Sequence, residues 1–288
     1  MTTAQTQQKT VAAPSSQEGR GVTFTPAAHE SVVGARRRKY LHLTLRWATP
    51  VVLIALWQLA ASQQWINTLY FPGPDQIFRT AISQFSDGTM TEAFVLTGWR
   101  TLLGFGVGAV IGFIAGVAIG AVPILRAAFE PVLYALWTIP KLALLPLLLL
   151  IFGLGSMPLI VLIILNTLFL VMIPTAAGIA GASPELLETA RAFSASPWQL
   201  FRHVLLPSSL VEVFVSLKIA SGAAILVAVA TEFVIGGGGL GYIIWNSWQV
   251  FLPDRMYVGI VVVAVTGSAF TLLVGVIGRR MVPWAHGL

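Results

Sequence analysis

The chain has 288 residues, of which 56% are hydrophobic and 10% are charged, whereas an ordinary soluble domain carries roughly a quarter charged residues. Several apolar runs reach the ~20 residues that cross a bilayer, so we expect an all-α, polytopic membrane protein rather than a soluble domain. The absence of cysteine excludes disulfides and thiol chemistry, and the net charge of +6 gathers where membrane topology would place it, which argues against a nucleic-acid partner.

The first 44 residues form a polar tail. Residues 1–44 are rich in Gln, Thr, Ser, Ala and Pro, lack the apolar core of a cleavable signal peptide, and are predicted to be disordered. The run Arg36-Arg37-Arg38-Lys39 directly precedes an apolar segment, which is typical of a topology anchor. Residues 45–288 are expected to form the transmembrane domain.

About six spanning helices are predicted, and basic residues set their direction. The spans lie at about 46–64, 99–122, 128–152, 157–180, 209–235 and 257–279. With the N-terminus inside, the cytoplasmic Lys and Arg are Lys9, Arg20, Arg36, Arg37, Arg38, Lys39, Arg46, Arg126, Arg191, Arg202, Arg279 and Arg280. The outer set is smaller: Arg79, Arg100 and Arg255. This bias places both termini and the loop 181–208 in the cytoplasm of a multi-pass protein of the cell membrane.

The second span carries a ridge of small residues. Glycines recur at every fourth position, namely Gly104, Gly108, Gly112, Gly116 and Gly120. Such a ridge lets helix backbones approach closely, within one subunit or between subunits.

The third span holds a lysine at membrane depth. Lys141 lies between Pro140 and Pro146, which interrupt the helical hydrogen bonds. A broken helix with a cation at depth predicts the lining of a translocation path, and the alternative is a structural lysine bound to a carbonyl.

The loop between the fourth and fifth spans contains two helix starts. Ser183 precedes Pro184, and Ser196 precedes Pro197, so both serines are predicted N-caps. Each helix has one apolar face, the first formed by Leu186, Ala190 and Phe193 and the second by Trp198, Phe201 and Leu205. Two capped amphipathic helices in an internal loop favour a docking surface for a partner.

The fifth span carries two further ionisable residues. Lys218 is a candidate for the translocation path, or it snorkels or pairs instead. Glu232, near the outer end, is a candidate for an outer gate, an intersubunit pair or an exposed interfacial carboxylate. The run Gly236–Gly239 that follows is interpreted as a flexible turn that allows close packing, because no Gly-Lys-Ser/Thr of a phosphate-binding loop follows it.

No catalytic or metal-binding set is found in the sequence. The four histidines are not spaced as ligands and no carboxylate cluster accompanies them; they are His29, His42, His203 and His286. We therefore expect no catalytic residue, no bound cofactor and no metal site in this chain.

The cytoplasmic loop resembles the signature of permease subunits of bacterial ATP-binding-cassette importers. That signature is Glu-Ala-Ala, three residues, Gly, nine residues, Ile, one residue and Leu-Pro. At the same spacings this chain has Glu188-Thr189-Ala190, Ser194, Val204 and Leu206-Pro207. Ser194 replaces the glycine, which would cost roughly 1–2 kcal/mol if that position needs a positive φ, whereas an ordinary bend would cost nothing.

The rest of the chain is similar to the nitrate, sulfonate and taurine branch of these permeases. The matching pieces are Pro72-Gly73-Pro74, Arg100 to Phe105, Ile139 to Pro146, Phe152-Gly153-Leu154-Gly155, Glu232, Gly239 to Ile243, Arg279-Arg280 and Pro283-Trp284. The resemblance implies a type I importer permease fold in which the loop 181–208 supplies coupling helices. It implies a substrate that is a small anion or sulfonate-like solute, for which Lys141 would provide electrostatic attraction.

The resemblance also implies partners. Two cytoplasmic ATPase subunits bind the ATP and Mg²⁺, a second permease copy completes the path, and an external solute-binding protein delivers the substrate. The residues expected to contact the ATPase are Glu188, Ala190, Arg191, Phe193, Ser194 and Pro207. The chain itself would be a transporter subunit and no enzyme. An ion-gradient-driven secondary transporter is the alternative, followed by a membrane enzyme or a scaffold subunit.

Overall fold

A computed structural model describes residues 48–284 of the protein. The predicted tail 1–44, the basic run Arg36 to Lys39 and residues 285–288 lie outside the described residues. The chain divides into two compact units, Met1–Ile54 and Ala55–Leu288, and every contact discussed below lies within the second unit.

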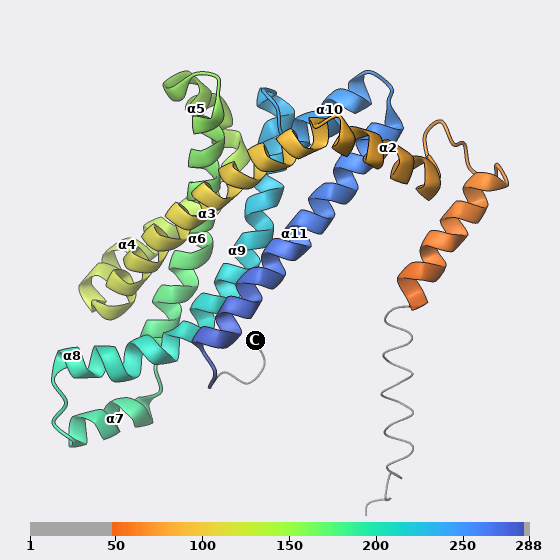
Figure 1. The fold of residues 1–288 in the computed structure, drawn as a ribbon. Helices are drawn as coiled ribbons and strands as arrows, with labels where there is room; N and C mark the ends of the chain where they lie inside the picture. The colour runs from red at the N-terminus through yellow and green to blue at the C-terminus, as the bar shows by residue number, and fades with distance from the viewer. Residues whose placement is uncertain (1–47, 285–288) are drawn as a thin grey trace, which may run out of the picture. The chain divides into compact units, whose positions relative to one another are not determined.

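The described residues form helices and no strands, as expected for an all-α membrane protein (Figure 1). An unlabelled helix Ala48–Ser62 comes first. The labelled helices are α2 (Pro74–Ser86), α3 (Thr89–Ala121), α4 (Pro123–Trp137), α5 (Leu145–Phe152), α6 (Ser156–Ala180), α7 (Pro184–Ala192), α8 (Pro197–Leu200), α9 (Leu206–Ile235), α10 (Leu240–Gln249) and α11 (Pro253–Met281).

Four of the described helices are long and apolar enough to cross a membrane, and five if one bent pair counts as a single span. The long helices are α3, α6, α11 and the continuous helix Pro197–Ile235. The bent pair comprises α4 and Lys141–Phe152, which meet at 86° and correspond to the predicted third span. The first predicted span corresponds to Ala48–Ser62, which is apolar but shorter than the ~20 residues of a straight crossing.

Helix α3 begins at Thr89, ten residues before the predicted start of the second span. The N-cap is Gly88, and the Asp87 side chain before it accepts a hydrogen bond from the Thr89 N–H at 2.9 Å, which gives a partner to one of the free donors of the first turn. Because of this earlier start, Arg100 lies about three turns inside the helix rather than at its first residues.

The glycine ridge packs α3 against α6 within one chain. A Cβ atom added at Gly112 would lie 2.6 Å from the Leu168 carbonyl oxygen, and one at Gly116 would lie 2.7 Å from the Met172 carbonyl oxygen. These separations leave no room for a side chain, so the two backbones touch along the ridge. The intrasubunit alternative for this ridge is confirmed.

One helix runs without interruption from α8 through α9. It spans Pro197–Ile235, 39 residues, which corresponds to roughly 58 Å at 1.5 Å per residue. A π-helical turn, Phe201–Leu205, lies just before Leu206-Pro207, where proline has no N–H with which to continue the α-helical ladder. The predicted second loop helix is therefore the beginning of the fifth span.

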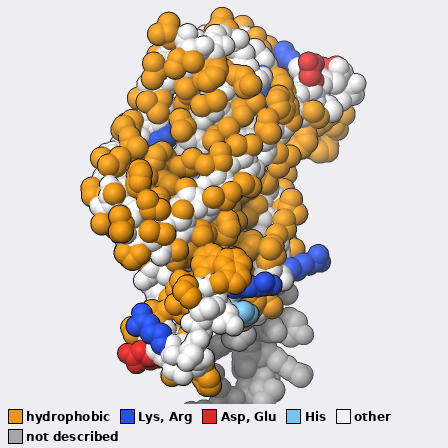
Figure 2. Space-filling view, turned by 90° about the vertical axis from the view of Figure 1, so that its left-hand side faces the viewer, with side chains coloured by type: hydrophobic (Ala, Val, Ile, Leu, Met, Phe, Trp, Pro, Cys, Tyr) orange, Lys and Arg blue, Asp and Glu red, His pale blue; other side chains and the backbone are white. Residues whose placement is uncertain are grey.

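The bundle has two distinct ends. Helices α7 and α8 lie beyond one end of the long helices, here called the loop end, and α10 lies at the opposite end (Figure 1). On the face drawn in Figure 2 the surface between the ends is predominantly apolar, as a bilayer requires, and most charged side chains lie toward the ends.

Candidate functional site

The loop end presents two short helices whose starts are fixed as predicted. The Ser183 hydroxyl accepts a hydrogen bond from the Leu186 N–H at 3.4 Å. Ser196 forms a capping box, because its hydroxyl accepts from the Gln199 N–H and the Gln199 side chain accepts from the Ser196 N–H at 2.8 Å. Both predicted N-caps are confirmed, so the loop is an ordered element.

The turn between these helices places Ser194 in the left-handed region, with a φ of 55°. The Ser194 N–H donates to the Arg191 carbonyl at 2.9 Å, and the Ala195 N–H donates to the Ala190 carbonyl at 3.0 Å. This pair of bonds is a Schellman motif, in which the left-handed position is normally glycine. Of the two alternatives left open by the sequence, the positive φ is the correct one.

Ser194→Gly is therefore expected to stabilise the turn by about 1 kcal/mol, because glycine adopts a positive φ without a steric penalty. The measurement is amide hydrogen exchange of residues 186–200 in the purified protein, which should slow about fivefold if local opening is the exchange route. Ser196→Gly is the contrasting variant and should speed exchange, since it removes the hydroxyl that caps the second helix. The φ of Ser196 is −66°, so glycine brings no conformational gain there. Equal or faster exchange in Ser194→Gly would contradict the account.

Large apolar side chains of this loop are exposed to solvent. The exposed fraction is 81% for Phe193 and 65% for Trp198, and Trp198 stacks on Phe201 at 5.7 Å between ring centroids. Glu188 and Arg191 are also exposed, and in the part of the chain that the structure describes neither forms an ion pair. Exposed aromatic groups beside unpaired charges are typical of an interaction surface.

The opposite end contains a buried ion pair. The Arg100 guanidinium donates from Nη1 to Glu232 Oε1 at 3.0 Å, and the two side chains are 5% and 0% exposed. Arg100 Nε also donates to the Ser156 hydroxyl at 3.0 Å, and Nη1 donates to the Gly238 carbonyl at 3.2 Å. Arg100 on α3 thus binds α6, α9 and the loop that follows α9.

Glu232 in turn binds the start of α10. Its carboxylate accepts from the Gly241 N–H at 2.9 Å and from the Thr97 hydroxyl at 2.9 Å. The Thr97 hydroxyl also accepts from the Leu240 N–H at 2.8 Å. A carboxylate at a helix N-terminus is favourable, because the first backbone N–H groups have no partner within the helix. We call Thr97, Arg100, Ser156 and Glu232 the Arg100–Glu232 network.

The glycines of the link from α9 to α10 make this packing possible. Gly236 to Gly239 all have a positive φ, between 72° and 105°. A Cβ atom at Gly239 would overlap the Glu232 carboxylate. The close packing predicted for this glycine turn is confirmed, because the absence of side chains admits the buried carboxylate.

Glu232 is thus not an exposed interfacial carboxylate, since its side chain is 0% exposed, and its pairing is with Arg100 of its own chain instead of a second subunit. Arg100 and Thr97 were not among the predicted site residues. A signal was available in the sequence, because an arginine and a glutamate that both fall within apolar helices are each costly alone and less costly when they pair.

Lys141 closes the break in the third span. Its ammonium donates to the Trp137 carbonyl and lies over the rings of Trp137 and Phe169, at 4.5 and 5.1 Å from their centroids. A cavity of about 170 Å³ adjoins it, lined by apolar side chains. The lysine therefore binds a carbonyl that the break leaves without a helical donor, as the structural alternative predicts.

Lys218 faces a different neighbour. Its aliphatic stem and ammonium pack near Gly275 of α11, where an added Cβ atom would lie 3.6 Å from Cε and 4.0 Å from Nζ. Among the described residues it has no ion pair, and Glu212 instead packs against Gly178 of α6. The structure thus does not bring Lys141, Lys218 and Glu232 together.

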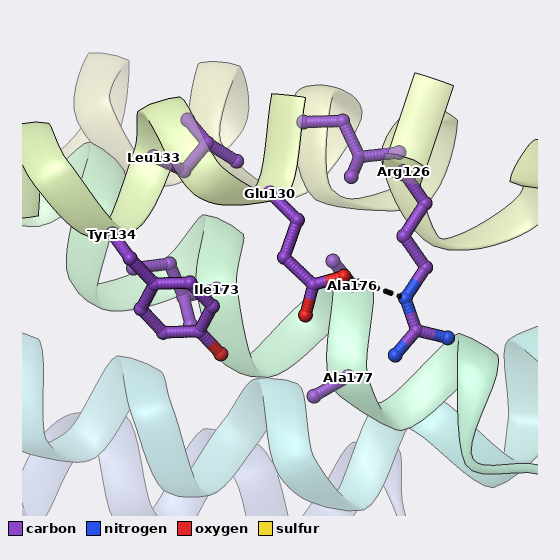
Figure 3. Close-up of a pocket in the computed structure, with 8 residues that line it drawn as sticks. Arg126, Glu130, Leu133, Tyr134, Ile173, Ala176 and Ala177 are labelled. Carbon is purple, nitrogen blue, oxygen red and sulfur yellow. Dashed lines mark hydrogen bonds and ion pairs between the residues drawn. The ribbon is translucent and has the colours of Figure 1, made fainter. Parts of the chain in front are cut away.

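A small pocket of about 80 Å³ lies between α4 and α6 (Figure 3). Arg126 and Glu130 form an ion pair at 3.2 Å on one face of α4, beside Tyr134 and Ala176. Both charged side chains are nearly half exposed, at 46% and 43%, and they satisfy one another. This pair therefore serves as an exposed reference for the buried pair at the opposite end.

Comparison with known proteins identifies relatives along most of the chain. The family model described as "Binding-protein-dependent transport system inner membrane component" matches residues 108–283. The chain is 30% identical to "Putative aliphatic sulfonates transport permease protein SsuC" of Escherichia coli, covering 86% of this chain and 94% of that one. It is 28% identical to "Taurine transport system permease protein TauC" of the same organism, covering 85% and 90%. It is 29% identical to "Nitrate import permease protein NrtB" of Leptolyngbya laminosa, covering 81% and 85%.

Solved structures support the same fold. An inward-facing MetNI methionine ABC transporter chain aligns with a TM-score of 0.53 at 22% identity, covering 67% of this chain and 96% of that one. A chain of a bacterial ABC transporter involved in the import of the acidic polysaccharide alginate aligns with a TM-score of 0.60 at 17% identity, covering 86% and 95%.

Proposed function

The chain belongs to the family of binding-protein-dependent transport system inner membrane components, and on that premise we propose how it works and what it carries. It is the permease subunit of an ATP-binding-cassette importer. We propose that two copies form the translocation path, that two cytoplasmic ATPase subunits bind the loop end, and that an external solute-binding protein delivers the substrate. Membership of this family decides against the secondary-transporter alternative.

The ordered loop 181–208 is the observation that carries the ATPase proposal. It exposes Phe193 and Trp198 to solvent, and it leads directly into the continuous helix that ends at Ile235. A rigid helix of this length can carry a displacement from the loop end to the opposite end, which is what alternating access requires. We propose that Phe193 and Ala190 pack in a groove of the ATPase and that Glu188 and Arg191 pair with charges there. Ser194 would fix the turn between the two short helices, and Pro207 the π-helical turn that precedes it in the continuous helix.

Phe193→Ala and Glu188→Lys are expected to lower transport-coupled ATP hydrolysis about tenfold. A buried aromatic side chain is a typical binding hot spot, and reversing a charge places like charges opposite one another in the interface. The measurement is ATP hydrolysis by the reconstituted complex with and without liganded binding protein. Phe251→Ala is the matched control, because Phe251 is a phenylalanine of similar exposure, 73%, outside the loop. Unchanged coupling in both loop variants would refute the proposed contact.

The proposed substrate is a small anion such as a sulfonate, taurine or nitrate, because these are the solutes in the names of the relatives. We propose that Lys141, at the helix break, contributes positive potential to the path as well as closing the break. Lys218 remains a second candidate for the path, since no described residue neutralises it.

Lys141→Gln is expected to reduce uptake of the transported anion at least about fivefold, because it removes a cation held over two aromatic rings. Lys141→Arg keeps the charge and a donor for the Trp137 carbonyl and should retain most of the uptake. The measurement is uptake of labelled taurine, an alkanesulfonate and nitrate into proteoliposomes. Full uptake in Lys141→Gln would exclude an electrostatic role for this lysine.

A further inference from the structure

The connection between α9 and α10 poses a mechanical problem. The covalent link is Gly236 to Gly239, a tightly folded segment whose residues have no side chains to pack against α10. Helix α10 instead packs against the last turns of α9, where Gly241 lies close to the Val229 carbonyl. Movement of α9 is therefore expected to reach α10 through the contacts between the helices.

The Arg100–Glu232 network is the polar part of the side-chain connection, beside the apolar packing of Leu240 and Ile243 on α3 and α11 and the stacking of Phe233 on Trp245. Glu232 lies in the last turn of α9 and holds the Gly241 N–H directly at 2.9 Å. Thr97 bridges Glu232 to the Leu240 N–H with two bonds of 2.9 and 2.8 Å. The first backbone N–H groups of α10 are thus bound to side chains of α9 and α3 and not to the glycine link.

Arg100 fixes the other side of the connection. Its guanidinium holds Glu232, the Ser156 hydroxyl at the start of α6, and the Gly238 carbonyl of the link. The side chains of Arg100 and Glu232 are nearly inaccessible to water, so the ion pair between them is strong compared with an exposed pair.

We infer that Arg100 and Glu232 are positioning residues that make α10 part of one rigid body with the outer ends of α3, α6 and α9, so that movement at the loop end reaches α10. The inference rests on the proposed function, since it needs an ATPase to move the loop end. It assigns the pair no contact with substrate.

The experiment measures the two ends separately. The chain contains no cysteine, so a single introduced cysteine carries a spin label without background. In the complex with its ATPase, Gln249→Cys reports the distance between the α10 helices of the two permease copies, and Thr189→Cys reports the distance between their α7 helices. Each distance is measured by pulsed electron paramagnetic resonance, first without nucleotide and then with ATP and orthovanadate.

Glu232→Gln is the test variant and Glu130→Gln is the matched control, because Glu130 is also paired with an arginine but is 43% exposed. We expect Glu232→Gln to keep the nucleotide-dependent change between the α7 helices and to lose the change between the α10 helices. Stimulation of ATP hydrolysis by liganded binding protein should fall at least about fivefold, the lower end of typical coupling between two sites. Glu130→Gln should behave as the unmodified protein does.

Two results would overturn the inference. One is an unaltered nucleotide-dependent change between the α10 helices in Glu232→Gln. The other is loss of the changes at both α7 and α10, which would mean that the pair only stabilises the fold. If Glu232→Gln does not assemble, Thr97→Val replaces it and Thr97→Ser serves as the rescue, because only serine retains the hydroxyl bridge. Failure of the proposed function is distinguishable, since the unmodified protein would then show no nucleotide response at α7.

Discussion

Arg100→Ala is expected to lower the free energy of unfolding by about 3–5 kcal/mol, because it leaves Glu232 charged and buried without its counter-ion. The carboxylate would retain only Thr97 and the Gly241 N–H as donors. The measurement is denaturant unfolding in detergent, followed by the fluorescence of the nine tryptophans. The double variant Arg100→Ala with Glu232→Gln should regain part of the loss, since no buried charge then remains unpaired.

The control for this prediction is Arg126→Ala. It breaks an ion pair of nearly the same length, 3.2 Å, in which both partners are almost half exposed. Exposed pairs of this kind contribute about 0–1 kcal/mol. If Arg100→Ala lowers the free energy of unfolding by less than about 1 kcal/mol, as the control does, the buried pair contributes no more to stability than an exposed pair.

Gly112→Leu is expected to destabilise the bundle by about 3 kcal/mol or more, because the added side chain forces α3 away from α6 and no rotamer can relieve the overlap. Even a Cβ atom at this position would lie 2.6 Å from the Leu168 carbonyl oxygen. The measurement is the midpoint of thermal unfolding together with the yield of monodisperse protein in detergent.

Gly106→Leu is the matched control on the same helix. A Cβ atom at Gly106 has no neighbour within 4 Å, so its change in unfolding free energy should stay within about 0.5 kcal/mol. Equal behaviour of the two variants would mean that the ridge does not set the distance between α3 and α6.

Local signals in the sequence predicted the loop end well. Ser183-Pro184 and Ser196-Pro197 start helices because a serine cap and a first-turn proline act over three residues, independently of the rest of the fold. The break at Pro140 was predictable for the same reason. The choice between a left-handed and an ordinary bend at Ser194 was not, since it depends on the path of both flanking helices.

The opposite end depends on contacts between distant residues. Arg100 and Glu232 are separated by 132 positions, and the predicted second span, which began ten residues late, put Arg100 at its very end instead of inside the helix. The glycine spacing on α3 predicted close packing but could not name its partner, because α6 and a second subunit offer similar apolar surfaces. Such pairings are set by tertiary packing and not by any local pattern.

The central claim, that the loop 181–208 binds an ATPase that drives this permease, is tested most directly by purification of the tagged chain from its native membrane. The account predicts that a cytoplasmic ATPase co-purifies in stoichiometric amount and that it is lost from the Phe193→Ala and Glu188→Lys double variant while the permease remains folded. Recovery of the folded permease without an ATPase, under conditions in which other importers stay assembled, would contradict the account.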